Sequence, residues 1–355
     1  MMFGFGSNKH TVIDIGSCAI KAAVVSGSFS NIQVEAADYR KLPPGIIKEG
    51  KINDNSIVAT ELKELLNEMN LKPKKVVTTI PTAHLITRNF EMPKLDEKEL
   101  IEALKWELDD VLPTSVEETT FDYMITAENE DSINVLVIAA NDEIIRQYKA
   151  PFKELGIKAD VINIQPMAMI SLLTYQGKLD DPTAIVDFGH QGTRIILCNK
   201  EHIFLTRTLD TGGYDFTKNL MDSQQFEYQE AEEYKWDNGL IKLVEDNPLD
   251  EDISLIGAGN DLEGIAKEIT DEISRSIEFY SIKNRGDSIQ NLYLTGGSSQ
   301  LKNLDELIEE EIDLKSEMID PFSDVTFDPA IEKNNKEFYA VVVGLGVSEV
   351  MHNES

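Results

Sequence analysis

Two stretches of the chain repeat one pattern, and this repeat constrains the fold more than any other feature of the sequence. Each stretch has an apolar run, an aspartate, a glycine two residues later, a polar turn and a second apolar run, which is typical of a β-hairpin. The first is TVIDIGSCAIKAAVV from Thr11 to Val25, and the second is TAIVDFGHQGTRIILC from Thr183 to Cys198. One such hairpin in each half predicts a duplicated α/β architecture whose two acidic turns face one another across a cleft.

The two aspartates of the repeat, Asp14 and Asp187, are candidates for holding a metal ion. Two facing carboxylates repel, and a Mg²⁺ ion bound through waters and carrying the phosphates of a nucleotide would relieve that repulsion. Turns rich in Gly and Ser bring backbone N–H groups close to phosphates, and Lys21 adds a positive charge. A single hairpin of this kind would be ordinary turn chemistry, so the prediction depends on the repeat.

A third glycine turn follows an apolar strand in the second half. The strand is predicted from Ile289 to Thr295, and it runs into Gly296-Gly297-Ser298-Ser299 before Leu301 starts another helix. Because Gly296 and Gly297 lack side chains, a flat base and sugar can lie against the backbone there. The three turns together predict a nucleotide site, and the alternative is three unrelated tight turns.

Hydrophobic periodicity predicts the remaining elements. Strands are expected at 32–37, 76–80 and 202–207, and amphipathic or apolar helices at 56–70, 262–283 and 338–350. Between the halves, from about His84 to Ile164, lies a block with its own outline of strand, helix, strand, strand, helix, strand. We interpret this block, whose first helix begins with the capping box Asp96-x-x-Glu99, as an inserted domain of about eighty residues.

Composition excludes several classes of function. The formal net charge is −31, and a surface this acidic repels nucleic-acid phosphates and anionic lipid headgroups, so neither DNA binding nor unaided membrane adsorption is expected. Cys18 and Cys198 lie far apart and outside any metal-binding spacing, which fits a reducing cytoplasm. No apolar run approaches the roughly 18 residues needed to span a bilayer, and residues 1–10 lack the apolar core of a signal peptide.

The three turns resemble those of the actin, Hsp70 and sugar-kinase ATPase superfamily, whose α/β fold is actin-like (ribonuclease H-like), duplicated and two-lobed. Asp14 to Lys21 is similar to its first phosphate motif, Asp187 to Thr193 to its second, and Leu294 to Leu301 to its adenosine motif. The resemblance implies ATP and Mg²⁺ as cofactors, with Asp14 and Asp187 at the metal. It also implies nucleotide contacts from Gly16, Ser17, Cys18, Lys21, Gly189, His190, Gln191, Gly192, Thr193, Gly296, Gly297 and Ser298.

A further run, Ala231-Glu232-Glu233-Tyr234-Lys235, is similar to an A-E-x-x-K helix whose Glu and Lys reach the ribose in bacterial actins. The resemblance therefore adds Glu232 and Lys235 to the nucleotide contacts. The same run also suits a solvated acidic helix.

The inserted block narrows the resemblance to the FtsA and PilM branch of bacterial actins, which carries an insertion called subdomain 1C. The run MPKLDEKELIEALKWELDDVLPTSVEETTFDY, from Met92 to Tyr123, strongly resembles the PilM family of type IV pilus assembly proteins. Arg207, Gly212-Gly213, Arg275-Ser276 and Phe279-Tyr280 also fit, and Gly213 joins the nucleotide contacts. The implied subdomains are 1A (1–83, 164–181 and 336–355), 1C (84–163), 2A (182–213 and 262–335) and 2B (214–261).

Two residues depart from the family pattern. Gln165 stands where many bacterial actins have Glu, and because Gln cannot act as a base it could only position the attacking water, so any hydrolysis of ATP is expected to be slow. Cys18 replaces a usual Ser and removes one hydroxyl donor from the phosphate turn. The candidate catalytic residues are Gln165 and Asp187, and Asp14→Ala is expected to abolish Mg-ATP binding while leaving the fold intact.

The resemblance implies a nucleotide-dependent assembly protein that stays in the cytoplasm and reaches the inner face of the membrane through partners. It implies binding of the cytoplasmic N-terminal tail of PilN, a single-span membrane protein, in a groove between subdomains 1A and 1C, with contacts to other assembly proteins and self-association as further options. An extended peptide in such a groove gains main-chain hydrogen bonds. Candidate groove residues are Arg88, Phe90, Leu104 and Leu108, although an ordinary core explains the leucines better than a groove does.

Two other functions remain open from the sequence. A small-molecule kinase would need a catalytic base for its acceptor, and no extra Asp-containing motif of that kind stands out between Asp14 and Asp187. An FtsA-like filament-forming division protein would end in a basic amphipathic membrane helix, and we expect none from the last residues of this sequence.

Overall fold

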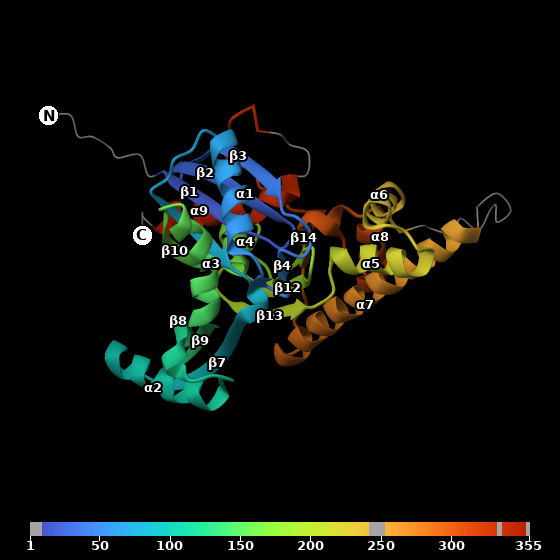
Figure 1. Cartoon of the computed structure of the whole chain (residues 1–355). Coiled ribbons are helices and arrows are strands. Elements are labelled where there is room, and N and C mark those ends of the chain that lie inside the picture. The colour runs from blue at the N-terminus through green and yellow to red at the C-terminus, as the bar shows by residue number, and fades with distance from the viewer. Residues whose placement is uncertain (1–8, 241–252, 332–335, 353–355) are drawn as a thin grey trace. The chain divides into compact units, whose positions relative to one another are not determined.

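The computed structural model describes residues 9–240, 253–331 and 336–352 (Figure 1). The chain divides into two compact units. The first unit comprises Met1–Ser171, Val325–Ile331 and Val341–Ser355, and the second comprises Leu172–Asp324 and Glu332–Ala340.

The first unit is built on a six-stranded sheet in the order β10-β6-β1-β2-β3-β16. Strands β1, β2 and β3 form an antiparallel meander, whereas β6 and β10 run parallel to β1. A short antiparallel hairpin, formed by the two-residue strands β4 and β5, is separate from this sheet. The bounds are β1 (His10–Ile15), β2 (Ala19–Ser28), β3 (Asn31–Lys41), β4 (Ile47–Lys48), β5 (Lys51–Ile52), β6 (Lys75–Ile80), β10 (Lys158–Ile164) and β16 (Thr326–Phe327).

Helices α1 (Asn55–Glu68) and α3 (Asp142–Glu154) pack on this sheet and share one apolar core with it. Helix α1 begins at Asp54, whose carboxylate accepts hydrogen bonds from two backbone N–H groups of the first turn, as an N-cap residue does. Leu62 and Leu65 of α1 meet Phe152 of α3 in the core, and all three are fully buried. The amphipathic pattern of α1 therefore positions the helix as the sequence predicts.

Helices α4 (Gln165–Tyr175) and α9 (Ala340–His352) pack closely against each other at a glycine of α9. A Cβ atom at Gly344 would lie 2.2 Å from the carbonyl oxygen of Ala168, and one at Gly346 would lie 2.3 Å from a methyl carbon of Val25 on β2. Both glycines lie inside α9 without interrupting it. They permit its backbone to approach α4 and the sheet, because no side chain separates them.

A separate three-stranded sheet, in the order β7-β9-β8, packs against helix α2 (Figure 1). The sequence predicted an inserted unit of six elements ending at residue 163. However, β10 pairs with β6 of the six-stranded sheet, and α3 packs in the core of that sheet. These two elements therefore belong to the six-stranded sheet and its core, and not to the inserted unit. The elements of the smaller sheet are β7 (Leu85–Pro93), α2 (Glu97–Val111), β8 (Thr119–Glu128) and β9 (Ser132–Asn141), with short 3₁₀ turns at Thr82–His84 and Val116–Glu118.

The second unit repeats the topology of the first. Its five-stranded sheet has the order β13-β12-β11-β14-β15, which matches β3-β2-β1-β6-β10 strand for strand in direction and pairing. The duplication predicted from the two hairpins is thus present in the sheets themselves. The bounds are β11 (Thr183–Phe188), β12 (Thr193–Cys198), β13 (Ile203–Leu209), β14 (Asn291–Thr295) and β15 (Ser316–Met318).

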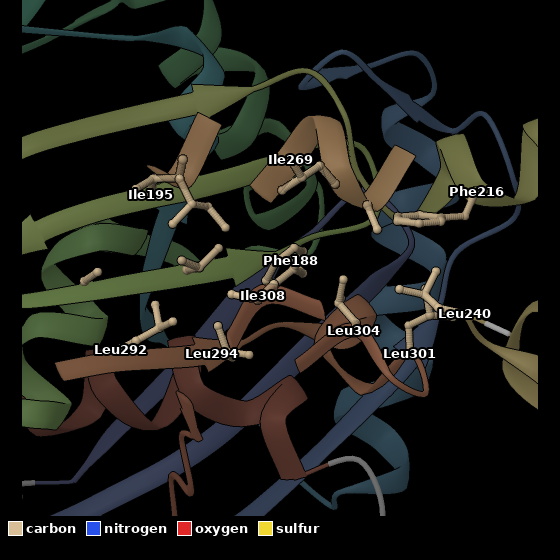
Figure 2. Close-up of a cluster of buried hydrophobic side chains, with 14 of the residues drawn as sticks. Phe188, Ile195, Phe216, Leu240, Ile269, Leu292, Leu294, Leu301, Leu304 and Ile308 are labelled. Carbon is tan, nitrogen blue, oxygen red and sulfur yellow. The ribbon is translucent and has the colours of Figure 1, made fainter. Parts of the chain in front are cut away.

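The core of the second unit lies between this sheet and its helices. Figure 2 shows Phe188 and Leu294 from the sheet beside Leu304 and Ile308 of one helix, with Ile269 from another. The same cluster includes residues from both predicted subdomains 2A and 2B, so it is one core. The helices are α5 (Gly213–Gln224), α6 (Tyr228–Asn238), α7 (Ile253–Lys283) and α8 (Leu304–Ile312), with 3₁₀ turns at Gly297–Gln300 and Lys336–Tyr339.

One boundary of the predicted subdomain 2A differs from the structure. Residues 325–331, which the prediction placed in 2A, belong to the first unit because β16 pairs with β3 there. No helix in the described part of the chain is both long and apolar enough to cross a membrane.

The glycine contacts generate a prediction with opposite signs at two helical sites. Gly344→Ala should destabilise the protein by about 1–3 kcal/mol, because its Cβ would overlap a backbone carbonyl that cannot move away. Gly264→Ala, in α7, meets nothing within 4 Å, so it should stabilise by about 0.5–1 kcal/mol through helix propensity. Urea denaturation of the two variants tests this, and a shift of the same sign in both would contradict it.

Candidate functional site

The first hairpin places a buried carboxylate opposite a cation. Asp14 near the end of β1 is the register partner of Lys21 on β2, and Lys21 Nζ lies 3.1 Å from Asp14 Oδ2. The other carboxylate oxygen, Oδ1, accepts hydrogen bonds from Thr79 Oγ1 at 2.7 Å and from Gln165 Nε2 at 3.0 Å. Asp14 is fully buried, so its charge depends on these three donors.

These contacts decide the protonation state of Asp14. Burial by itself raises the pKa of a carboxyl, but the Lys21 ammonium and the hydrogen bonds from Thr79 and Gln165 favour the charged form more strongly. The pKa of Asp14 is therefore lowered. At neutral pH the residue is a carboxylate with a fixed orientation.

The turn after Asp14 is held by backbone contacts. The N–H of Gly16 donates to the carbonyl of Ala19 at 3.0 Å, and the carbonyl of Cys18 accepts from the N–H of Leu42 at 2.8 Å. A Cβ at Gly16 would come within 3.0 Å of Lys21 Nζ. The predicted contacts Gly16, Ser17, Cys18 and Lys21 thus form one compact turn around Asp14.

The second hairpin repeats this geometry with a different cation. Asp187 on β11 is the register partner of Arg194 on β12, and Arg194 Nη1 lies 2.9 Å from Asp187 Oδ2. Arg194 follows Asp187 by seven residues, as Lys21 follows Asp14. Sequence reasoning missed Arg194, although this equal spacing is present in the repeat and was the signal that could have identified it.

The predicted glycines of the second unit converge on the Asp187 hairpin. Gly213 donates its N–H to the carbonyl of Gly189 at 2.9 Å. A Cβ at Gly213 would lie 2.0 Å from Ser298 Oγ, and one at Gly296 would lie 2.3 Å from Asp187 Oδ1. Gly296 also has a φ of +87°, which favours glycine. The structure therefore brings the second phosphate turn, Gly213 and the Gly296 turn together within one unit.

Glu232 and Lys235 of α6 also reach this cluster. Lys235 is buried, and its Nζ donates to the carbonyl of Gly213 at 3.1 Å, to Thr217 Oγ1 at 2.7 Å and to Glu232 Oε1 at 2.6 Å. An ammonium has three hydrogens, and these three acceptors account for them. Lys235 thus anchors the start of α5, and its contact with a ribose stays a prediction that requires one of these bonds to change.

His190 and Gln191 occupy the polar turn between β11 and β12. The His190 ring packs against Tyr214 with 5.6 Å between ring centroids. Burial lowers the pKa of His190, and the nearby Lys235 ammonium lowers it further. A neutral imidazole is therefore expected in this turn at neutral pH.

The metal prediction can be tested against the donor set. Within the described ranges, no three His, Cys, Asp or Glu side chains gather as a metal site would require. Asp14 and Asp187 each have a cation against one carboxylate oxygen. These carboxylates fit a hydrated Mg²⁺ held through waters, as predicted, better than a dehydrated ion bound directly.

The four predicted peptide-groove residues differ in their exposure. Leu104 and Leu108 are fully buried between α2 and the small sheet, and Phe90 packs against the same core. Arg88 is exposed, and its Nη1 donates to the carbonyl of Thr87 at 2.9 Å. The leucines are therefore core residues.

A pocket of about 280 Å³ does lie between the two sheets of the first unit. Two of the strands that line it, β8 and β10, are edge strands of their sheets. Such edges present backbone N–H and C=O groups that a further strand can use. The lining includes Phe121, Asp122, Ile138, Lys149, Asp160 and Ile162.

The duplicated sheets define an α/β protein of the actin-like ATPase fold, and solved structures agree. MreB5 of Spiroplasma citri bound to AMPPNP has a TM-score of 0.55 at 15% identity, over 97% of this chain and 97% of that chain. The ethanolamine utilization protein EutJ from Carboxydothermus hydrogenoformans has a TM-score of 0.58 at 14% identity, over 96% of this chain and 89% of that chain.

The family follows from two further comparisons. The model of the type IV pilus assembly protein PilM matches residues 12–349, so the chain belongs to the PilM family. A solved PilM–PilN type IV pilus biogenesis complex is similar over 96% of this chain and 98% of that chain, with 26% identity and a TM-score of 0.83.

The buried contacts of Asp14 generate a prediction about acid stability. Because the folded-state pKa of Asp14 lies below its ordinary value of about 3.9, the unfolded chain binds more protons near that pH. The stability from Asp14 is complete above this range and is lost as pH falls through it. Asp14→Asn should therefore lose less stability than wild type when urea denaturation is repeated from about pH 5 down to pH 3.

At neutral pH, Asp14→Asn should be less stable than wild type by about 1–3 kcal/mol, because Lys21 loses its counter-ion. Asp14→Ala also removes the acceptor of Thr79 and Gln165 and should cost more. The expectation that Asp14→Ala leaves the fold undisturbed is therefore tested together with Asp14→Asn, which keeps an acceptor for Thr79 and Gln165. Parallel stability curves of Asp14→Asn and wild type against pH would contradict the role given to this carboxylate.

Proposed function

We propose that this PilM family member is an ATP-binding assembly protein of a type IV pilus machine, and that it binds the cytoplasmic N-terminal tail of PilN. On this proposal the protein works in the cytoplasm and reaches the inner face of the membrane through its partner. ATP and Mg²⁺ are its cofactors, and the nucleotide tunes its affinity for the tail. The subdomain division into 1A, 1C, 2A and 2B stays part of the proposal, with 1C reduced to the small sheet and α2.

The single observation on which nucleotide binding rests is the pair of equivalent hairpins. In each unit a carboxylate at the end of a strand lies opposite a cation on the next strand, at 3.1 Å in the first and 2.9 Å in the second. Each hairpin turn also contains glycine at a position where an added Cβ would meet a neighbouring backbone or side-chain atom, so the chain can turn tightly there. Cations and N–H groups suit phosphate oxygens, and carboxylates suit hydrated Mg²⁺. MreB5, which shares the fold, was solved with AMPPNP.

The surroundings of Gln165 favour slow hydrolysis. Its amide nitrogen donates to Asp14 Oδ1 at 3.0 Å, and its amide oxygen accepts from Thr82 Oγ1 at 3.3 Å. A side chain held in this way can orient a water but cannot remove its proton. We therefore propose that bound ATP acts chiefly as a ligand that sets a conformation, with at most slow turnover.

The pocket between the two sheets of the first unit supports peptide binding. It is lined by apolar residues such as Ile138 and Ile162, with Asp122, Lys149 and Asp160 among its polar residues. An extended tail could pair with the edge of β8 or β10 and place alternate side chains in the pocket. The similar PilM structure was solved as a complex with PilN. Accordingly, the tail is assigned here to this pocket and not to the buried Leu104 and Leu108.

The nucleotide proposal predicts that both hairpin cations contribute to ATP affinity. Arg194→Gln and Lys21→Gln should each weaken ATP binding by about tenfold or more, because one charge-assisted contact to a phosphate is lost. Lys63→Gln, on the exposed face of α1, serves as the matched control and should bind as wild type. Isothermal titration with Mg-ATP measures all three. If Arg194→Gln bound as tightly as wild type, the second hairpin would not be a phosphate site.

The peptide proposal predicts a contrast between two isoleucines of the small sheet. Ile138→Ser, in the pocket, should weaken binding of a synthetic PilN tail by about tenfold or more through lost apolar burial. Ile125→Ser, at a position that is 44% exposed on β8 and outside the pocket, should bind the tail as wild type. Fluorescence anisotropy of the labelled tail is the measurement. Equal losses in both variants would place the tail elsewhere.

A further inference from the structure

The donors to the Asp14 carboxylate and the lining of the peptide pocket are neighbours along the chain. Thr79, which donates to Asp14 Oδ1 at 2.7 Å, is followed by Ile80, and Ile80 lines the pocket. Gln165, which donates to the same oxygen at 3.0 Å, is preceded by Ile164, which also lines the pocket. At the end of each strand, a residue that lines the pocket is therefore next in the chain to a donor to the aspartate.

The two strands concerned are paired directly at these positions. On β6 and β10, Thr79 is the register partner of Asn163, and Ile80 is the register partner of Ile164. β6 in turn pairs with β1, which holds Asp14. Asn163 and Ile162 line the pocket as well, so an occupant that moves the end of β10 must also move the start of α4, where Gln165 lies.

A third contact closes the arrangement. Gln165 Oε1 accepts from Thr82 Oγ1 at 3.3 Å, in the short turn that leads into Leu85 of β7, another pocket residue. Gln165 thus bridges Asp14 to the connection that enters the small sheet. Because Asp14 is buried and its oxygen Oδ1 has two side-chain donors, a shift of either donor changes the position of the carboxylate.

We infer that Thr79 and Gln165 are positioning residues that couple the peptide pocket to the nucleotide hairpin at Asp14. The inference rests on the proposed function, because it takes a PilN tail in the pocket and ATP at the hairpins. A tail that seats against Ile80 and Ile164 changes the hydrogen bonds to Asp14, and ATP at Asp14 and Lys21 changes the pocket. The coupling is reciprocal, because each ligand alters the affinity of the other by the same factor.

Two neighbouring threonines offer a matched test. Thr79→Val removes the hydroxyl that donates to Asp14 but keeps the size of the side chain. Thr78→Val, one residue earlier on the same strand, removes a buried hydroxyl for which the structure shows no hydrogen-bond partner. Both variants replace a buried threonine of β6 with valine, so they differ chiefly in the contact with Asp14.

The experiment measures the affinity of the synthetic PilN tail with and without Mg-ATP, for wild type, Thr79→Val, Thr78→Val and Gln165→Leu. In wild type we expect ATP to change the affinity for the tail by about fivefold or more. Thr79→Val and Gln165→Leu should reduce that ratio to within about twofold of one, and Thr78→Val should keep the wild-type ratio. Thr79→Val should still bind each ligand alone within about threefold of wild type.

The possible results separate the inference from the proposed function. If the tail or ATP fails to bind wild type at all, the proposed function is wrong, and the inference with it. If both bind but neither affects the other, the two sites stand and the coupling is overturned. A wild-type ratio that persists in Thr79→Val and Gln165→Leu, or that is lost equally in Thr78→Val, also overturns the assignment to these two residues.

Discussion

Both sheets contain the same interaction, a carboxylate near the end of the first strand opposite a cation on the second. Burying such a pair costs desolvation energy that its attraction only partly offsets, so it adds little to stability compared with an apolar pair. The pair nevertheless occurs in both units, as Asp14 with Lys21 and Asp187 with Arg194. An interaction that recurs at equivalent positions without a clear gain in stability is best explained by ligand binding.

The two copies of this pair have diverged in their surroundings. Asp14 is fully buried and its second oxygen accepts from Thr79 and Gln165. Asp187 instead has the glycine backbone of a neighbouring turn against its second oxygen, where a Cβ at Gly296 would lie at 2.3 Å. The first aspartate is therefore fixed by side-chain hydrogen bonds, and the second is enclosed by close backbone packing. Because the donors Thr79 and Gln165 belong to β6 and α4, a movement of those elements changes the hydrogen bonds to Asp14.

The sequence predicts the duplication, most elements and most of the candidate site, because these depend on local patterns that repeat. It fails for β10, because an alternating strand does not reveal which sheet it joins, and its partner β6 lies far away in the chain. For Leu104 and Leu108, helical spacing fits either a core or a groove, and the core that the sequence favours is the one found. The sequence does contain the signal for Arg194, because Arg194 follows Asp187 by the same seven residues by which Lys21 follows Asp14.

The acidity of the chain means that a nucleotide site would have to be a local one. With 33 lysines and arginines against 64 aspartates and glutamates, the field of the whole protein repels a nucleotide, and long-range attraction cannot supply the affinity. On the proposed function, the affinity must come from contacts at close range between phosphates and cations or backbone N–H groups. Lys21, Arg194 and Lys235 are cations placed beside glycine turns and largely withdrawn from water. An acidic protein that retains cations in these positions has little reason to do so other than to hold an anion or the backbone that surrounds it.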